Sequence, residues 1–553
     1  MPPSPDRALP RASHLSRRAL LAGSAATGTT APLAARPARR AAAQATPAAG
    51  APLPAAVRAV MAKPRYADAV WSFLVADLDS GETLLAHEPD RLALTGSCRK
   101  LYSVGLALRQ LGPDARATTA VHRTGEVDPA GTLAGDLVLV AAGDLTFGGR
   151  RLPGDEIEFT SFDHNDANNL GTAILTPQDP LAALDDLAAQ VRAAGIAEVA
   201  GDVIVDDRRF QSFRVPNQNL LVTPIMVNEN MVDLTALPTT PGSPAGVGHR
   251  PRSAAFAVDA AVGTGPAGSD DTVALSDDGH AVCVGTPGCA GTLAGDLPAD
   301  YRAPLSGSPE WVRTFRIEDP AAYARTAFVE ALGRAGVTVA AAPVAPNPAA
   351  KLPAADALAA ETQVAAYVSP PYAQEARLIL KVSLNLGANL ALMKHGLAHG
   401  ARTVETALAA EREALVGDLG LDPAGFDFPT NGSGSPDSRA TPRATVNLLA
   451  AMAASPVAAP YRAALPILGV DGSLAGTGTT LPARGHVLAK TGTTLGEGQL
   501  VAQNLAGYID AKSGRRLAFA LFLNDAGPVQ AIEDVTDVFE DEAVVTSAFW
   551  EAF

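Results

Sequence analysis

The sequence has 553 residues, of which 47% are apolar and 18% are charged, and its formal net charge is −15. This length and composition are those of a globular protein with room for two or three domains. The negative charge is spread along the chain and no basic stripe occurs, which argues against nucleic acid as a partner.

The first 50 residues have the composition of an export signal rather than of a folded domain. Arg17 and Arg18 precede a weakly apolar stretch rich in Gly, Thr and Ala, with small-residue cleavage sites near 34–46. This segment resembles a twin-arginine signal peptide, and the alternative is a disordered Ala/Arg tail. No run of 18 apolar residues follows, so we expect an exported protein without a transmembrane anchor, periplasmic or associated with the cell wall.

The mature chain opens with two predicted strands and a helix. Residues 70–88 predict two strands joined by a turn at 79–81. A second turn leads into a helix that ends at Gly112, with apolar residues at helical spacing. Ser97 therefore lies at the start of this helix, with Lys100 one turn further along the same face.

Residues 119–355 differ in residue pattern from the segments on either side. Strand-like runs alternate with loops rich in Gly, Pro and Asp, and one clear helix is expected at 180–196. The Ala/Pro-rich stretch 340–355 is a candidate boundary between this block and the segment that follows. This block is expected to form separate, β-rich material.

The last third of the chain returns to longer elements. Helical patterning occurs at 372–398 and 440–456, and three antiparallel strands are expected between 485 and 525. A closing helix is predicted at 528–553. Strands and a helix thus open the mature chain, and helices, strands and a helix end it, which predicts one α+β domain interrupted by a long insertion.

Three short motifs occur in order along the chain. They are S-x-x-K at 97–100, S-x-N at 383–385 and K-T-G at 490–492, followed by Thr493. Each is weak alone, but this trio is typical of class A β-lactamases and penicillin-binding proteins. Only seven of the 43 basic residues are lysine, which makes the two motif lysines unusual. Lysine can act as a base at working pH, whereas arginine cannot.

The first two motifs suit nucleophilic catalysis. The hydroxyl of Ser97 needs a neighbouring base, and Lys100 can be neutral if Lys490 and the helix dipole lower its pKa. Ser383 can relay a proton toward the leaving group, and Asn385 can donate to the substrate amide or to Lys100. Taken singly, the motifs could be only a helix cap, a solvated lysine and a strand end; their joint occurrence favours catalysis.

The third motif supplies groups for substrate binding. Lys490 and Thr491 offer the charge and donors that a free carboxylate needs. Gly492 would let the substrate backbone approach the strand edge. The backbone N–H groups of Ser97 and Thr493 are the natural oxyanion hole. We expect neither a metal nor a cofactor.

Beyond the trio, longer stretches such as "FLVADLDSGETLLAHEPDRLALTGSCRK", "NGSGSPDSRATP" and "LPILGVDGSLAGT" carry a family resemblance. The sequence resembles the D-alanyl-D-alanine carboxypeptidase/endopeptidase family of low-molecular-mass, class C penicillin-binding proteins over nearly the whole mature chain. This implies a serine β-lactamase/DD-peptidase-like fold, an antiparallel sheet with helices, split by a β-rich two-part insertion. The expected division is signal and linker at 1–50, peptidase domain at 51–118 and 356–553, and inserted domains at 119–355.

The resemblance also implies an activity. It suggests an exported serine D-Ala-D-Ala carboxypeptidase or endopeptidase that acts on peptidoglycan stem peptides or cross-links through an acyl-enzyme on Ser97, with β-lactams as inhibitors. A β-lactamase or esterase is disfavoured by the 285 residues between Ser97 and Ser383. A non-catalytic cell-wall-binding homologue is disfavoured by the complete polar set. Leu384 departs from the family's usual S-D-N, and the loop at 431–438 matches one that borders the family's active site.

The chain has three cysteines, too few for a disulfide scaffold. Cys283 and Cys289 are spaced to close a small loop and could form a disulfide after export; the alternative is two free thiols. Cys98 is expected to face away from the side of the helix that carries Ser97 and Lys100.

Overall fold

The computed structural model describes residues 52–216, 219–354 and 357–553. The predicted signal peptide lies outside the described residues. Within these ranges, every helix is too short or too polar to cross a bilayer.

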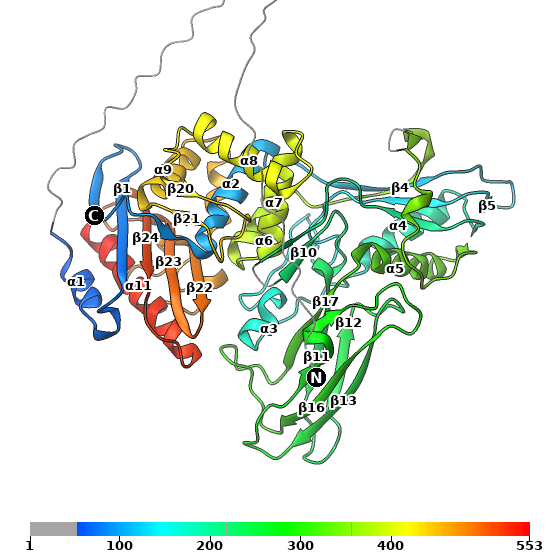
Figure 1. Ribbon diagram of the computed structural model, residues 1–553, viewed down its shortest axis with the longest axis horizontal. Helices are drawn as coiled ribbons and strands as arrows, with labels where there is room; N and C mark the ends of the chain where they lie inside the picture. Colours follow the sequence, from blue (N-terminus) through cyan, green and yellow to red (C-terminus); the bar gives the residue numbers. More distant parts are fainter. Residues whose placement is uncertain (1–51, 217–218, 355–356) are drawn as a thin grey trace, which may run out of the picture. The chain divides into compact units, whose positions relative to one another are not determined.

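A five-stranded antiparallel sheet joins strands from both ends of the described chain (Figure 1). Its order is β2-β1-β24-β23-β22, so β22, which carries the K-T-G motif, is an edge strand. The strands are β1 (Val70–Asp77), β2 (Thr83–His87), β22 (Val487–Gly496), β23 (Gln499–Asp510) and β24 (Arg516–Asn524). The predicted opening pair of strands and the three late strands are thus confirmed.

Helices pack on both faces of this sheet, which confirms the predicted α+β class. The helices are α1 (Ala55–Met61), α2 (Lys100–Leu111), α6 (Tyr372–Lys381), α9 (Pro442–Ala453), α10 (Ala458–Ala463) and α11 (Ile532–Ala552). A hydrophobic core lies on each face of the sheet, and alternate residues of β1 pack into one core or the other. Phe73 and Val75 belong to the core shared with α11, whereas Leu74 belongs to the core shared with α2 and α9.

The S-x-N motif interrupts the helical stretch predicted at 372–398. Helix α6 ends at Lys381 and α7 (Asn385–Ala398) begins at Asn385. Between them Ser383 has φ +61°, a left-handed conformation that residues other than glycine rarely adopt. Helix α8 (Val404–Glu413) follows and packs against α7.

The serine of the first motif lies one turn before the helix proper. Ser97 is in the 3₁₀ turn η2 (Gly96–Arg99), and α2 begins at Lys100. β3 (Ala93–Leu94), just before this turn, belongs to a small three-stranded sheet with β20 (Phe426–Asp427) and β21 (Arg439–Ala440).

The segment between α2 and α6 contains several small sheets. Their orders are β19-β4-β6-β8, β12-β11-β17-β15, β13-β16-β14, β18-β7-β5 and β10-β9. The strands are β4 (Thr118–Arg123), β5 (Thr132–Leu133), β6 (Leu137–Val140), β7 (Glu198–Val199), β8 (Val203–Asp206), β9 (Phe213–Val215), β10 (Leu220–Val222), β11 (Met231–Leu237), β12 (Gly246–Arg250), β13 (Ala257–Gly265), β14 (Ala274–Leu275), β15 (His280–Ala281), β16 (Ala290–Pro298), β17 (Trp311–Ile317), β18 (Thr338–Val339) and β19 (Gln363–Val368).

Three helices also lie in this segment: α3 (Ala167–Leu170), α4 (Ala182–Ala193) and α5 (Pro320–Arg334). Helix α4 confirms the one predicted there, but α5 was missed. Its start carries clear signals, since the side chain of Asp319 caps the N-terminus and Pro320 is the first helical residue. β19 pairs with β4, and its buried side chains belong to the core of this segment. The sequence predicted the domain boundary before β19, at 340–355.

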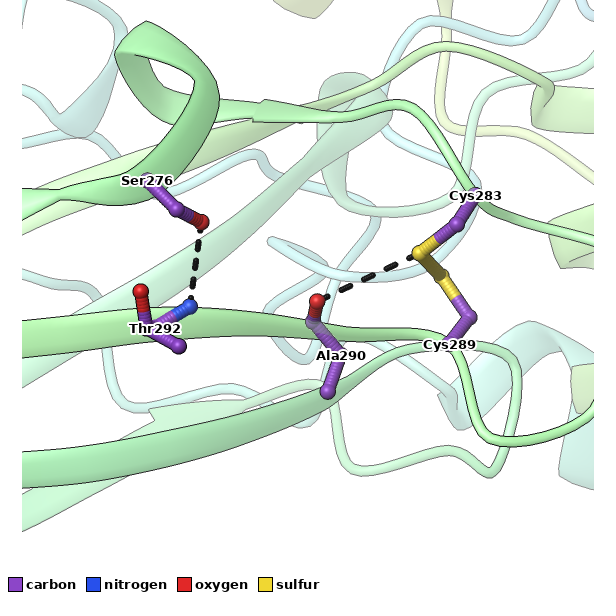
Figure 2. Close-up of a disulfide and its surroundings, with 5 residues drawn as sticks. All are labelled: Ser276, Cys283, Cys289, Ala290 and Thr292. Carbon is purple, nitrogen blue, oxygen red and sulfur yellow. Dashed lines mark hydrogen bonds between the residues drawn. A yellow bond between two sulfur atoms is a disulfide. The ribbon is translucent and has the colours of Figure 1, made fainter.

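Cys283 and Cys289 form a disulfide, as the spacing suggested, with Cα atoms 5.3 Å apart (Figure 2). The bridge closes the loop just before β16. On that strand, the N–H of Thr292 donates to the hydroxyl of Ser276. The disulfide therefore fixes the entry to a strand far in sequence from the three motifs.

Candidate active site

Two glycines allow the turn around Ser97 (residues 95–99, called the serine turn below) to pack directly against β22. Gly96 has φ +46°, and a Cβ there would lie 2.8 Å from the backbone nitrogen of Thr493. A Cβ at Gly492 would lie 2.3 Å from the carbonyl oxygen of Thr95. Gly492 therefore accommodates the serine turn, a role that the sequence did not suggest. The packing places Gly96, the residue before Ser97, against the backbone of Thr493.

The amine of Lys100 is the centre of the site. Its Nζ lies 2.5 Å from Ser97 Oγ and 2.6 Å from Asn385 Oδ1. It lies 3.2 Å from the carbonyl oxygen of Ser433 and 3.3 Å from Ser383 Oγ. Lys100 is fully buried, although Ser97 is partly exposed.

The surroundings of Lys100 favour its neutral form. Burial, and then the charge of Lys490, keep the pKa of Lys100 well below its ordinary value. A neutral amine has two N–H groups and one lone pair. Asn385 Oδ1 and the Ser433 carbonyl can only accept, so they take the two N–H groups. The lone pair is then left for the hydroxyl proton of Ser97.

Lys490 lies on the other side of the Ser383 hydroxyl. Its Nζ is 2.9 Å from Ser383 Oγ, 2.8 Å from the carbonyl oxygen of Thr491 and 3.3 Å from Thr491 Oγ1. Burial lowers the pKa of Lys490 to about 8, so this amine is mostly charged at neutral pH. The hydroxyl of Ser383 therefore bridges an amine whose neutral form is favoured and an amine that is mostly charged.

The loop at 431–438 supplies the carbonyl that contacts Lys100. Asn431 Oδ1 accepts from the N–H of Ser433 at 2.8 Å, and Gly432 is hydrogen-bonded to α2 by its carbonyl and to α7 by its N–H. These contacts fix the Ser433 carbonyl in place. The sequence marked this loop only through family resemblance, because a backbone carbonyl has no side-chain signature.

Thr493 is anchored to the helix behind the sheet. Its Oγ1 donates to Gln503 Oε1 at 2.8 Å, and Gln503 Nε2 donates to Glu542 Oε2 at 3.2 Å. Gln503 and Glu542 are fully buried, and burial raises the pKa of Glu542 well above its ordinary value. Burial therefore favours the protonated form of Glu542. Neither residue was expected from the sequence.

The two residues between Ser97 and Lys100 are both buried. The Cys98 thiol donates to the carbonyl oxygen of Lys490 at 3.3 Å, and burial raises its pKa to about 12. This thiol therefore faces β22. Arg99 forms a bidentate ion pair with Glu411 of α8, with one bond at 2.9 Å.

The candidate metal ligands of the described residues lie elsewhere and are already paired. Asp163, His164 and Glu229 are buried together in the middle segment. Arg150 donates to both carboxylates, and His164 bonds to Glu229 and Asp233. Burial alone would lower the pKa of His164, but Asp233 and Glu229 raise it to about 10. A protonated ring cannot bind a metal, so this cluster is an ion-pair network.

One hydrogen-bonded network thus contains most of the predicted side chains: Ser97, Lys100, Ser383, Asn385, Lys490 and Thr491. Gly492 and Thr493 lie beside it in β22. A serine hydroxyl against a neutral lysine amine, with a charged lysine behind, has the chemistry of a serine hydrolase with a lysine base.

The comparison with protein families identifies the group. The model of the D-Ala-D-Ala carboxypeptidase 3 (S13) family matches residues 53–543. The chain belongs to this family and is a serine peptidase.

Individual relatives agree with this assignment. The chain is 29% identical over 517 residues to a D-alanyl-D-alanine carboxypeptidase from Actinomadura sp. (strain R39), covering 87% of this chain and 83% of that protein. The fold is similar to that of penicillin binding protein 4 from Haemophilus influenzae, with a TM-score of 0.65 and 17% identity over 90% of this chain and 99% of the other. The same protein in complex with a β-lactam gives a TM-score of 0.61.

Proposed function

We propose that this protein is an exported serine D-Ala-D-Ala carboxypeptidase or endopeptidase that cleaves peptidoglycan stem peptides or cross-links through an acyl-enzyme on Ser97. The observation that carries the proposal is the 2.5 Å contact between Lys100 Nζ and Ser97 Oγ, made while two obligate acceptors occupy the N–H groups of the amine. Family membership supplies the substrate class.

In acylation, Ser97 Oγ attacks the carbonyl carbon before the terminal D-Ala, and its proton passes to Lys100. The backbone N–H groups of Ser97 and Thr493 bind the oxyanion. The C–N bond then breaks, and the Ser383 hydroxyl passes a proton from Lys100 to the leaving amine. Water hydrolyses the resulting ester by the same route in reverse.

Lys490 and Thr491 bind the carboxylate of the leaving D-Ala in this proposal. A buried ammonium and an adjacent hydroxyl form charge-assisted hydrogen bonds with such an anion. β-Lactams carry a comparable carboxylate beside a strained amide, so we expect them to acylate Ser97 as well.

The experiment is incubation with a fluorescent penicillin followed by intact-mass analysis, with Ser97→Ala as the control. A long-lived adduct on the wild type that is absent from Ser97→Ala supports the proposal. Rapid turnover of the penicillin would instead indicate a β-lactamase or esterase. No adduct and no turnover would indicate a non-catalytic homologue.

We further propose that the peptidase domain comprises residues 51–118 and the chain after β19, with the segment between them as an insertion. The pairing of β19 with β4 favours this boundary over one at 355. Export rests on the Arg17-Arg18 signal. Replacing both arginines by lysine should leave the protein unprocessed in the cytoplasm, which cell fractionation would test.

A further inference from the structure

The turn η11 (Gly472–Leu474) places another hydroxyl beside the K-T-G motif. Ser473 Oγ lies 2.9 Å from Thr491 Oγ1, and Ser473 is partly exposed. Lys490 Nζ lies 3.3 Å from the same threonine oxygen. The hydroxyl of Thr491 is therefore contacted from two sides, by an amine and by a second hydroxyl. Ser473 belongs to none of the three motifs.

The turn is held firmly against helix α6. The carboxylate of Asp471 accepts from Lys381 Nζ at 2.7 and 2.6 Å, and Lys381 is buried. Asp471 also accepts from the backbone N–H of Ile467 at 2.9 Å. Gly472 has φ +60°, and a Cβ there would lie 2.6 Å from the carbonyl oxygen of Lys381. An ion pair and close backbone packing thus fix the position of Ser473.

This turn links the S-x-N and K-T-G segments. Lys381 is two residues before Ser383, and Ser383 accepts from Lys490 at 2.9 Å. From Lys490, contacts lead through Thr491 to Ser473 and back along the turn to Lys381. A ring closed in this way leaves Ser473 little freedom to move away from Thr491.

The protons available on the hydroxyls of Thr491 and Ser473 indicate a role for Ser473. The hydroxyl of Thr491 has one proton and two lone pairs. It can donate to a substrate carboxylate only if Ser473 is the donor in the bond between the two hydroxyls. On the basis of the function proposed above, we propose that Ser473 is a positioning residue: it donates to Thr491 Oγ1 and so leaves the threonine proton for the terminal carboxylate of the substrate.

The consequence is a preference for substrates whose leaving group carries a carboxylate. Hydrogen bonds to an ionised acceptor are stronger than those to a neutral one. Losing the orientation of Thr491 should therefore weaken binding of an anionic leaving group and leave a neutral one unaffected. Ser97 and Lys100 do not depend on Ser473, so the chemical step itself should not change.

The test uses two thioesters with the same D-Ala acyl group, one with a leaving group that carries a carboxylate and one with a neutral leaving group. Thiol release gives kcat and KM for the wild type, Ser473→Ala and Ser473→Thr. We expect Ser473→Ala to raise KM for the anionic thioester by about three- to tenfold with little change in kcat. Kinetics with the neutral thioester should stay the same, and Ser473→Thr, which keeps the hydroxyl, should restore KM.

Ser455→Ala is the matched control. Its hydroxyl is also partly buried, and it donates to the carbonyl oxygen of Met452, which belongs to none of the three motifs. Equal loss with both thioesters, no loss with either, or no rescue by Ser473→Thr would overturn the role of Ser473. Failure of the wild type to hydrolyse either thioester, or to form a Ser97 adduct, would instead refute the proposed function.

Discussion

Lys100 and Lys490 both contact the hydroxyl of Ser383, at 3.3 and 2.9 Å. Two buried amines this close disfavour each other's charged form, so one of them is neutral. Burial and the charge of Lys490 lower the pKa of Lys100 and so favour Lys100 as the neutral one. The site therefore combines a base for the serine and a cation for the substrate within a few ångströms.

The pKa of Lys490, about 8, predicts an upper pH limit for binding of anionic substrates. A lysine with a lowered pKa loses its charge as the pH rises through that value. KM for a carboxylate-bearing thioester should therefore rise above about pH 8. The measurement is kcat and KM between pH 6 and 10. In Lys490→Arg, which keeps its charge throughout, this rise should vanish; an identical rise in that variant would assign it to another group.

Glu542 predicts a pH-dependent effect on stability. Burial raises its folded-state pKa above the unfolded value, so the folded protein holds the proton more tightly. The stability that Glu542 contributes therefore falls as the pH rises above its unfolded-state value of about 4.3. Glu542→Gln, which mimics the protonated acid, should gain melting temperature relative to wild type as the pH increases from 5 to 8.

The control for this effect is Glu533→Gln, an exposed position on the same helix. Its melting temperature should follow that of the wild type at each pH. A constant difference between Glu542→Gln and wild type across the range would mean that Glu542 is ionised in the folded protein.

Much of this site could be predicted from the sequence, because side-chain chemistry at fixed spacing carries the information. Ser97 and Lys100 are one helical turn apart, and a poor nucleophile needs a base at that distance. The strand and helix patterns likewise predicted the sheet and α11. Helix α5 was missed although Asp319 and Pro320 mark its start, because its many alanines give weak amphipathic contrast.

Other contributions depend on tertiary packing and leave no local signal. The Ser433 carbonyl reaches Lys100 only because the loop is fixed by contacts to α2 and α7. In the sequence, Gln503 and Glu542 have no feature that distinguishes them from other strand and helix residues. Their connection to the site depends on the pairing of Thr493 with Gln503 across β22 and β23 and on the hydrogen bonds that follow from it. The packing of Gly492 against the serine turn also has no signal in the sequence, because it is a close approach of two backbone segments.

Gly492→Ala should therefore separate the serine turn from β22. A Cβ there would overlap the carbonyl oxygen of Thr95, so the turn must shift. We expect the β-lactam acylation rate to fall by about a hundredfold, since small displacements of reacting groups are costly. Gly333→Ala is the control, because a Cβ at that position meets no atom within 4 Å. Acylation of Gly492→Ala at the wild-type rate would contradict the packing argument.

The ion pair between Arg99 and Glu411 predicts a large loss of stability when one partner is removed. Both side chains are buried, so Arg99→Ala leaves an unpaired carboxylate and should cost about 3–5 kcal/mol of unfolding free energy. Replacing both residues by methionine should cost much less. Denaturant unfolding measures both; equal losses in the single and double variants would show that packing, rather than the unpaired charge, determines the effect.

The general-base role of Lys100 is the central claim, and Lys100→Arg tests it most directly. Arginine has roughly the same reach but is permanently protonated, so it cannot accept the serine proton. The measurement is the rate of Ser97 acylation by a β-lactam in wild type, Lys100→Arg and Lys490→Arg, with melting temperatures to confirm folding. We expect Lys100→Arg to lose about 10²–10⁴-fold and Lys490→Arg to retain more activity. Acylation of a folded Lys100→Arg protein at near the wild-type rate would contradict the account.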